Sequence, residues 1–322
     1  MVQEFCLPAP AHYFPFSSGK YEVRPGLCSL ETDFGNGRLD KYIFQIDTQY
    51  FDYLAQKRLA VTENIDKYFA TYNLTTDTAQ CVIGFILNRL IADYPLFFKI
   101  TKHAQTQQLY NKLTGTTIRV DDNEADISVL VEMLRNLGMY VQEDFAVLQL
   151  SNDNSQYLSL LHLCFPNYWS AQEKIGRDFV SIHGPVPGMN RINRQTQNIL
   201  SAVLNKGPYV RFAWGLTTDR RLNHHPIPPY TYSDATWQGR SFDIKSPQLF
   251  VRTERQTIVG FPDQKSILFT IRTYFEDVHI IKKNMEMKKK LICAIESMGD
   301  DSVIYKGLTQ SRTDIINWLQ DY

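Results

Sequence analysis

Five short runs rich in β-branched and aromatic residues constrain the fold of this 322-residue chain more than any other feature. Apolar and polar residues tend to alternate within them, and Asn, Asp, Pro or Gly separates them, as is typical of strands. The runs are FAVLQL (145–150), YLSLLHLCF (157–165), YVRFAWGL (209–216), LFVRTERQTIVGF (249–261) and SILFTIRTYF (266–275). Their number predicts a mostly antiparallel sheet.

Helical patterns occupy other parts of the chain. The pattern is helical from Tyr42 to Tyr72, and Asp47 or Thr48 is a candidate N-cap for the free N–H groups of the first turn. Further helices are predicted at Thr76–Asp93, at Asp126–Asn136 with Gly138 as a left-handed C-cap, at 190–204 and at Thr313–Leu319, and a basic amphipathic stretch covers Asn284–Met298.

Residues 1–36 are rich in proline and glycine, and we expect them to be extended and turn-rich. The chain has no internal repeat and no clear linker. These patterns together predict an α+β protein with a single compact domain over residues 1–322, in which helices pack on an antiparallel sheet and an N-terminal helical part is added.

Charge and cysteine content argue against several classes of protein. Lys+Arg and Asp+Glu both number 34, so the chain has no basic excess for nucleic acid or an acidic membrane. The five cysteines lack CxxC and CxxCH spacings, which disfavours a zinc ribbon, a redox pair and a c-type haem; we expect buried, reduced thiols. The N-terminus lacks signal-peptide features and no apolar run could span a bilayer, so we expect a cytoplasmic protein.

Common nucleotide-binding and catalytic motifs are absent. The sequence has no G-x-G-x-x-G after a strand, no phosphate-binding loop, no G-x-S-x-G and no H-E-x-x-H. Neighbouring residues on a strand point to opposite faces, so His224 and His225 could both bind one metal only from a loop. We expect this pair to lie in a polar loop.

His183 is the first candidate for chemistry. It ends an apolar, strand-like run over residues 179–182 and is followed directly by Gly184, Pro185 and, two residues later, Pro187, which restrict the backbone behind it. A rigid platform suits an axial haem ligand whose Nε2 binds iron while Nδ1–H donates to a neighbouring acceptor. The alternative is a histidine hydrogen-bonded in a turn, and the residues alone do not exclude it.

Charged residues interrupt the strand-like sequence 251–274: Arg252, Glu254, Arg255 and Arg272. By alternation, Arg252, Glu254 and Gln256 share one face of the strand and Arg255 lies on the other. Such charges are costly on an inward face unless they are paired. They form either the polar wall of a buried site or a structural network between strands.

The run 209–216 places Arg211 and Trp214 on opposite faces of its strand. A lone arginine on a strand is usually exposed, so this signal is weak by itself. Trp169 and Trp214 suit either the core or the wall of a pocket.

These segments resemble, in this order, the haem-dependent oxidative N-demethylase alpha-subunit-like family over about residues 15–280. The similarity begins with DKYIFQIDTQYFDYLAQKRLAV (40–61), ADYPLFF (92–98) and VQEDFAVLQ (141–149). It is most specific in CFPNYWSAQEKIGRDFVSIHGPVPG (164–188) and RTERQTIVGFPDQKSILFTIRTY (252–274).

The resemblance implies a PAS-like core at about residues 140–280 and a non-covalent haem b. It implies an oxygen-dependent monooxygenase that demethylates a small secondary amine and releases formaldehyde. Electrons would come from a flavin/iron–sulfur partner, and a further partner would use tetrahydrofolate to take the formaldehyde. Carried over, His183 becomes the axial iron ligand, Arg211 and Glu254 become catalytic candidates, and the candidates for cofactor contact are Arg255, Trp169 and Trp214.

Two departures keep a second hypothesis open. Ala213 stands before Trp214 where the family pattern usually has Asn, and the loss of an amide removes a donor and an acceptor. VGFPDQ also replaces a more usual arginine–leucine–proline run. A non-catalytic haem protein that senses gas or redox state, or a haem-free structural subunit, is the alternative. The basic stretch KKNMEMKKK is either a solvated helix face or a docking site for an acidic partner.

Overall fold

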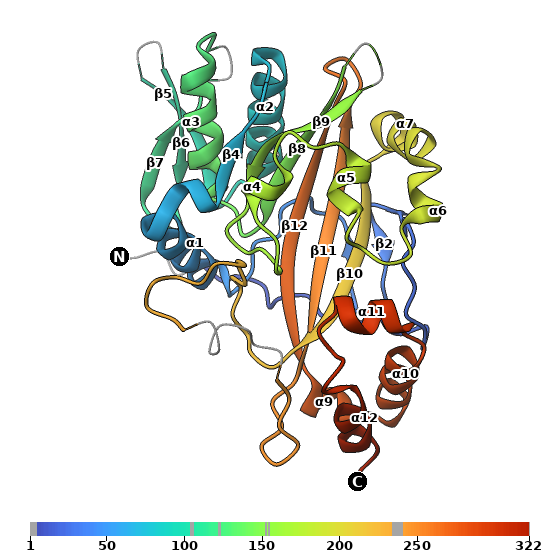
Figure 1. The fold of residues 1–322 in the computed structure, drawn as a ribbon. Coiled ribbons are helices and arrows are strands. Elements are labelled where there is room, and N and C mark those ends of the chain that lie inside the picture. The colour runs from blue at the N-terminus through green and yellow to red at the C-terminus, as the bar shows by residue number, and fades with distance from the viewer. Residues whose placement is uncertain are drawn as a thin grey trace.

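The computed structural model describes residues 5–103, 106–121, 124–151, 153, 155–233 and 241–321. Its centre is a seven-stranded sheet in which every neighbouring pair is antiparallel (Figure 1). In spatial order the strands are β1 (Cys28–Ser29), β10 (Tyr209–Thr217), β11 (Phe250–Phe261), β12 (Ser266–Asp277), β8 (Asp144–Leu150), β9 (Gln156–His162) and β4 (Phe69–Thr71). The five predicted strands are therefore confirmed, as is an α+β fold with an antiparallel sheet.

Two small sheets lie outside the central one. The first pairs β2 (Thr32–Asp33) with β3 (Leu39–Asp40), and the second joins β5 (Phe98–His103), β6 (Thr106–Asn111) and β7 (Thr116–Arg119). Sequence patterns did not predict the three-stranded sheet, because β7 exposes most of its residues and β6 buries only two of six.

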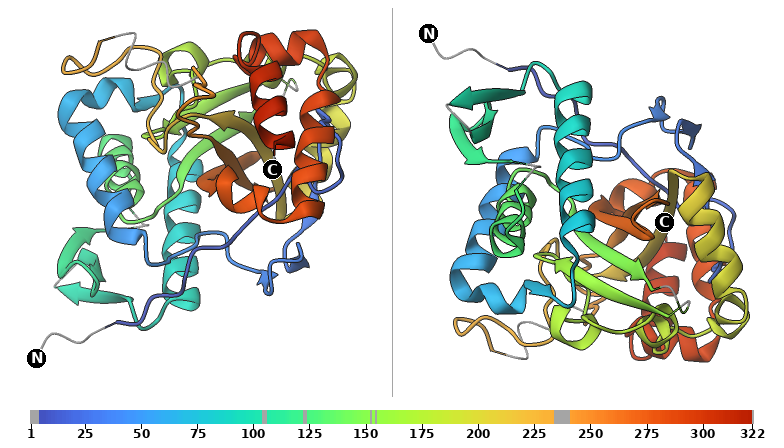
Figure 2. Two further views of the ribbon diagram at one scale, coloured as in Figure 1. Left: turned by 90° about the horizontal axis from the view of Figure 1, so that it is seen from below. Right: turned by 90° about the horizontal axis from the view of Figure 1, so that it is seen from above.

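One face of the central sheet, which we call the back face, is covered by the N-terminal third of the chain. Helices α1 (Tyr50–Asn64), α2 (Thr76–Asp93) and α3 (Ile127–Gly138) share an apolar core with strand residues of this face, and η1 (Ile65–Lys67) follows α1. Residues 40–47 pack on this face, where Asp40 pairs with Arg255 and Asp47 with Arg272, while Cys28 and Ser29 form the edge strand β1 of the sheet itself. Figure 2 shows α1 to α3 and the three-stranded sheet on one side of the molecule, with α7 and the C-terminal helices on the other.

The opposite face, which we call the site face, carries four short helices from the connection between β9 and β10: α4 (Ala171–Lys174), α5 (Phe179–His183), α6 (Asn190–Asn193) and α7 (Thr196–Lys206). Leu200 and Val203 of α7 pack against Ile258 and Ile267. The approach is so close at Gly260 that an added Cβ would lie 2.3 Å from the Leu204 carbonyl oxygen.

The C-terminal helices close one end of β10 and β11. They are α9 (Val278–Lys282), α10 (Met285–Glu296), α11 (Asp300–Tyr305) and α12 (Arg312–Gln320). Their core includes Phe16, Trp214 and Val251 from the back face of the sheet. Among the described helices, none has the length and apolar character needed to cross a membrane.

Predicted helix positions were partly right. The helix at Thr76–Asp93 is confirmed, and α10 and α12 lie in the stretches predicted for them. The helical region from Tyr42 to Tyr72 was too wide, because α1 starts only at Tyr50; Asp47 instead accepts a hydrogen bond from the Gln49 N–H. The helix predicted at 190–204 is divided into α6 and α7.

Two local predictions were wrong for identifiable reasons. Gly138 is the last helical residue of α3 and has no left-handed backbone; it is small because the buried His162 ring packs against it. Residues 179–182 form a helix, since Asp178 caps the Ser181 N–H at 2.8 Å and starts a turn. A four-residue apolar run does not by itself distinguish a strand from a helix.

The cysteines are all free, but only Cys164 is buried and Cys6 is exposed, so the expectation of five buried thiols was wrong. His224 and His225 lie in a loop, as predicted, yet both are buried. His224 Nε2 lies 3.0 Å from an Asp219 carboxylate oxygen, and the His225 ring meets Tyr68 edge-on.

Candidate functional site

The register of β10 and β11 brings the predicted catalytic residues together on the site face. Arg211 lies opposite Gln256, and Ala213 lies opposite Glu254. Directly paired residues of antiparallel strands point to the same face, so Arg211 and Glu254 are near neighbours. The face predicted for Arg252, Glu254 and Gln256 by alternation is confirmed.

Glu254 is held by its own strand. Arg252 Nη1 lies 2.5 Å from Oε1, and Gln256 Nε2 donates to Oε2 at 3.0 Å. The Arg252 side chain is only 3% exposed and the Glu254 side chain 14%, and Arg252 also donates to the Phe165 carbonyl oxygen. Both carboxylate oxygens are therefore fixed by donors, and the ion pair is shielded from most of the solvent.

Arg211 has no such partner. Its Nε is buried without a hydrogen bond, and no carboxylate among the described residues forms an ion pair with it. Burial lowers the pKa of the Arg211 guanidinium, while the charge of Glu254 opposes that shift. Because an arginine starts from so high a pKa, Arg211 remains a cation.

His183 ends α5 beside this charged row. Its Nδ1 lies 2.8 Å from the Phe179 carbonyl oxygen, which can only accept, so Nδ1 carries the hydrogen and Nε2 keeps a free lone pair. The pKa of His183 is lowered to about 4, chiefly by burial and also by the positive charges of Arg211 and Lys174, while the hydrogen bond to Phe179 opposes the shift. The ring is therefore neutral at pH 7, as a metal-binding imidazole must be.

The surroundings of His183 are apolar and held in place. The Phe179 ring lies against the imidazole with 4.3 Å between ring centroids. Lys174 Nζ of α4 donates to the Ile182 carbonyl oxygen at 2.8 Å and so ties α4 to α5. Trp169, Phe179 and Ile182 are half-buried and pack against the core under α7. Aromatic and aliphatic surface next to a neutral imidazole suits a flat, largely apolar cofactor.

Two predicted cofactor contacts lie on the back face, away from His183. Arg255 is fully buried and pairs with Asp40 through both Nε and Nη2, and Nη2 also donates to the Tyr42 carbonyl oxygen at 2.6 Å. Trp214 packs in the core with Phe16. Their environment is that of structural residues, so the candidate site keeps His183, Arg211, Glu254 and Trp169 and leaves out Arg255 and Trp214.

A second buried cluster contains three possible metal ligands. The ligand atoms of Asp144, His162 and Cys164 lie within 4.8 Å of one another. The Lys57 ammonium, itself fully buried, lies 3.3 Å from Asp144 Oδ1 and donates to the Gly138 carbonyl oxygen at 2.9 Å. A fixed positive charge beside the carboxylate opposes a metal ion, so Lys57 makes this cluster a structural ion pair.

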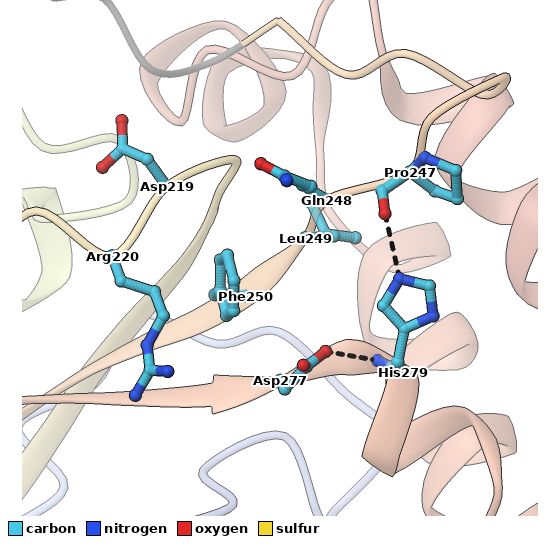
Figure 3. Close-up of a pocket in the computed structure, with 8 residues that line it drawn as sticks. All are labelled: Asp219, Arg220, Pro247, Gln248, Leu249, Phe250, Asp277 and His279. Atoms are coloured by element: carbon cyan, nitrogen blue, oxygen red, sulfur yellow. Dashed lines mark hydrogen bonds between the residues drawn. The ribbon is translucent and has the colours of Figure 1, made fainter.

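Two surface hollows lie elsewhere. One of about 560 Å³ runs along α2 beside Phe261. The other, of about 520 Å³, is drawn in Figure 3. In it, His279 Nε2 donates to the Pro247 carbonyl oxygen, and the His279 N–H donates to Asp277. Neither hollow is lined by a residue of the candidate site.

The support around the candidate ligand was not predicted from the sequence. The Phe179 carbonyl is a partner of His183 only because residues 179–183 are helical, since a helix places residues four apart together. The role of Lys174 could not be predicted from the sequence, because its hydrogen bond to the Ile182 carbonyl oxygen depends on the path of the chain between α4 and α5.

A family model described as "Haem-dependent oxidative N-demethylase, alpha subunit-like" matches residues 38–316. The chain belongs to this family. The matched range of this N-demethylase-like chain includes His183, Arg211, Glu254 and the helices between β9 and β10.

The family name refers to a haem-dependent oxidative enzyme and to an alpha subunit. The residues of the site face fit a haem on their own chemistry. The neutral imidazole offers a free nitrogen, half-buried apolar side chains adjoin it, and the buried Arg211 Nε lacks a partner.

Proposed function

We propose that this chain binds a non-covalent haem b through His183 and is an oxygen-dependent oxidoreductase that demethylates a small secondary amine. Electrons would reach it from a partner carrying flavin and an iron–sulfur centre. The observation that carries the proposal is the His183 imidazole, whose Nδ1–H is held by the Phe179 carbonyl while Nε2 is free. This is the arrangement that histidine ligands of metals generally have.

The chain's own residues would have distinct roles. A bound haem supplies the oxygen and electron chemistry. The Phe179 carbonyl fixes the tautomer and orientation of His183. Arg252 and Gln256 each donate to one oxygen of the Glu254 side chain, and each oxygen has a second lone pair that can accept a hydrogen bond from an amine N–H. Trp169 would form part of the apolar wall.

We also propose a PAS-like core at about residues 140–280. Counted in chain order, the five long strands β8 to β12 lie side by side as third, fourth, fifth, first and second. The helices α4 to α7 are inserted between the second and the third of these strands. A PAS-like sheet is expected to have this strand order and this position for its inserted helices.

A second candidate function is a haem protein without catalysis, or a haem-free subunit of the same fold. Ala213 favours it, because the residue opposite Glu254 offers no hydrogen bond to a substrate. The enzyme hypothesis predicts turnover, and the second candidate predicts none.

The test begins with an absorption titration of the purified full-length protein with hemin. Wild type should develop a Soret band at one equivalent, and His183→Ala should lose or strongly shift it. His12→Ala is the matched control, since the His12 side chain is 63% exposed and lies outside the site. An unchanged spectrum in His183→Ala eliminates this ligand. Formaldehyde release from an N-methyl amine, with oxygen and an electron donor, then separates the enzyme from the non-catalytic protein.

A further inference from the structure

Arg211 differs from the other arginines of the central strands. β10, β11 and β12 contain four arginines, and three of them have carboxylate partners. These pairs are Arg252 with Glu254, Arg255 with Asp40 and Arg272 with Asp47. Among the residues that the structure describes, no carboxylate pairs with Arg211, and its Nε is buried without a hydrogen bond.

The charges of the site face do not cancel. Glu254 is neutralised by Arg252 and its second oxygen is taken by Gln256, so it does not serve Arg211 as a bound counter-ion. The nearby Lys174 adds positive charge, which together with Arg211 lowers the pKa of His183. Arg211 is half-buried, and a partly buried cation whose Nε lacks a partner is costly unless a ligand supplies the anion.

The side chains that follow Arg211 on this face of β10 are small. Ala213 follows Arg211 on the same face of β10, and Gly215 continues the row. The aliphatic part of Lys306 covers Gly215, about 3.5 Å from where a Cβ would be. On this face of β10, Ala213 therefore presents only a methyl group next to Arg211.

We propose that Arg211 is the carboxylate-binding residue of this site. The planar guanidinium fork matches a carboxylate in shape and charge. The proposal rests on the proposed function for the origin of that carboxylate: a haem propionate, or the carboxylate of an N-methylated amino acid. In the second case a zwitterion would place its carboxylate at Arg211 and its amine N–H at Glu254, which lies two residue pairs along the ladder, on the same face.

The experiment compares Arg211→Gln and Arg211→Lys with wild type, with Arg191→Gln as the control for loss of an exposed arginine on α6. The first arm titrates each full-length protein with hemin and with hemin dimethyl ester, whose propionates carry no charge. The second arm measures binding of N-methylglycine and of dimethylamine by ligand-observed NMR. The third arm records the thermal midpoint of each free protein.

If the carboxylate is a propionate, Arg211→Gln weakens hemin binding by about tenfold or more and leaves the ester unaffected. If it belongs to the substrate, the same change weakens N-methylglycine binding by a similar factor and leaves hemin and dimethylamine unaffected. Arg211→Lys recovers part of either loss. The thermal midpoint of Arg211→Gln equals or exceeds that of wild type, because an unpaired, partly buried charge has been removed.

Arg211→Gln that matches wild type in both binding arms overturns the proposal, and so does a wild type that binds no carboxylate ligand at all. If wild type takes up no hemin but binds N-methylglycine through Arg211, the haem function fails while the carboxylate site stands. If hemin binds through His183 and Arg211→Gln changes neither ligand, the haem function stands and the carboxylate site fails.

Discussion

Ala213 and Glu254 lie directly opposite each other on β10 and β11. No side chain of β10 reaches the carboxylate from that position, because a methyl group is all that Ala213 presents. The two donors that fix Glu254 both come from its own strand, two residues away on either side.

Ala213→Asn should therefore change ligand binding more than stability. Opposed residues of a strand pair lie within about 5 Å of each other at Cβ, so an amide would reach the Glu254 carboxylate or a ligand beside it. One added hydrogen bond predicts about a two- to tenfold gain in affinity for dimethylamine, measured by NMR titration. Ala213→Leu, which adds bulk without a polar group, should show no gain. Equal affinities of wild type, Ala213→Asn and Ala213→Leu for dimethylamine would show that residue 213 does not contact the ligand.

Arg252→Met should destabilise the protein by about 3–5 kcal/mol, because it leaves Glu254 buried without its cation. Urea unfolding at pH 7 measures the loss. Arg252→Met combined with Glu254→Gln should recover part of it, since the unpaired charge is gone. Arg191→Met, at an exposed position of α6, should stay within about 0.5 kcal/mol of wild type. If Arg252→Met were as stable as this control, the ion pair of Arg252 with Glu254 would contribute nothing to stability.

Acid should destabilise the fold through His183. Burial lowers its folded pKa to about 4, below the value near 6.5 of an unfolded histidine, so the unfolded chain binds more protons between these values. The neutral ring's contribution is complete above pH 6.5 and is lost as the pH falls toward 4. In His183→Gln, the slope of unfolding free energy against pH should be lower by at most about 1.4 kcal/mol for each pH unit. Ring NMR of the folded protein that shows His183 titrating near 6.5 would contradict this.

Gly138→Ala should be strongly destabilising. Its Cβ would lie 2.3–2.7 Å from atoms of the His162 ring. That ring is buried and stacks on Phe145, with 5.4 Å between centroids, so it has little room to move. We expect a loss of about 1–3 kcal/mol or more in chemical denaturation. Gly299→Ala meets nothing within 4 Å and should be nearly neutral. Similar effects at both positions would mean that the His162 contact is not tight.

The central strands could be predicted because each is long enough for its period to be unambiguous. β11 is twelve residues long, and strand parity alone places Glu254 and Arg255 on opposite faces. Residues 179–183 were too few to distinguish a strand from a helix, and the hydrogen bond from the Ser181 N–H to Asp178 decides the matter. The sheet of β5, β6 and β7 was missed because little of it is buried.

Strand parity separates two faces but does not say which of them holds a site. Arg255 is a reasonable cofactor contact as long as its partner is unknown, and that partner, Asp40, is 215 residues away in the sequence. The same holds for Arg272 and Asp47. Contacts of this range depend on the path of the N-terminal segment, which local patterns do not encode. For Arg211 the decisive observation is also structural. Among the described residues no carboxylate pairs with it, and its Nε is buried without a hydrogen bond.

The salt bridges behind the sheet limit how far this protein can be shortened. A fragment of residues 140–280 would keep Arg255 and Arg272 but lose Asp40 and Asp47, which stand upstream of it. Two guanidinium groups would then open onto water on a surface shaped for packing. A shortened protein would therefore have to retain the segment that carries Asp40 and Asp47 if both arginines are to keep their partners.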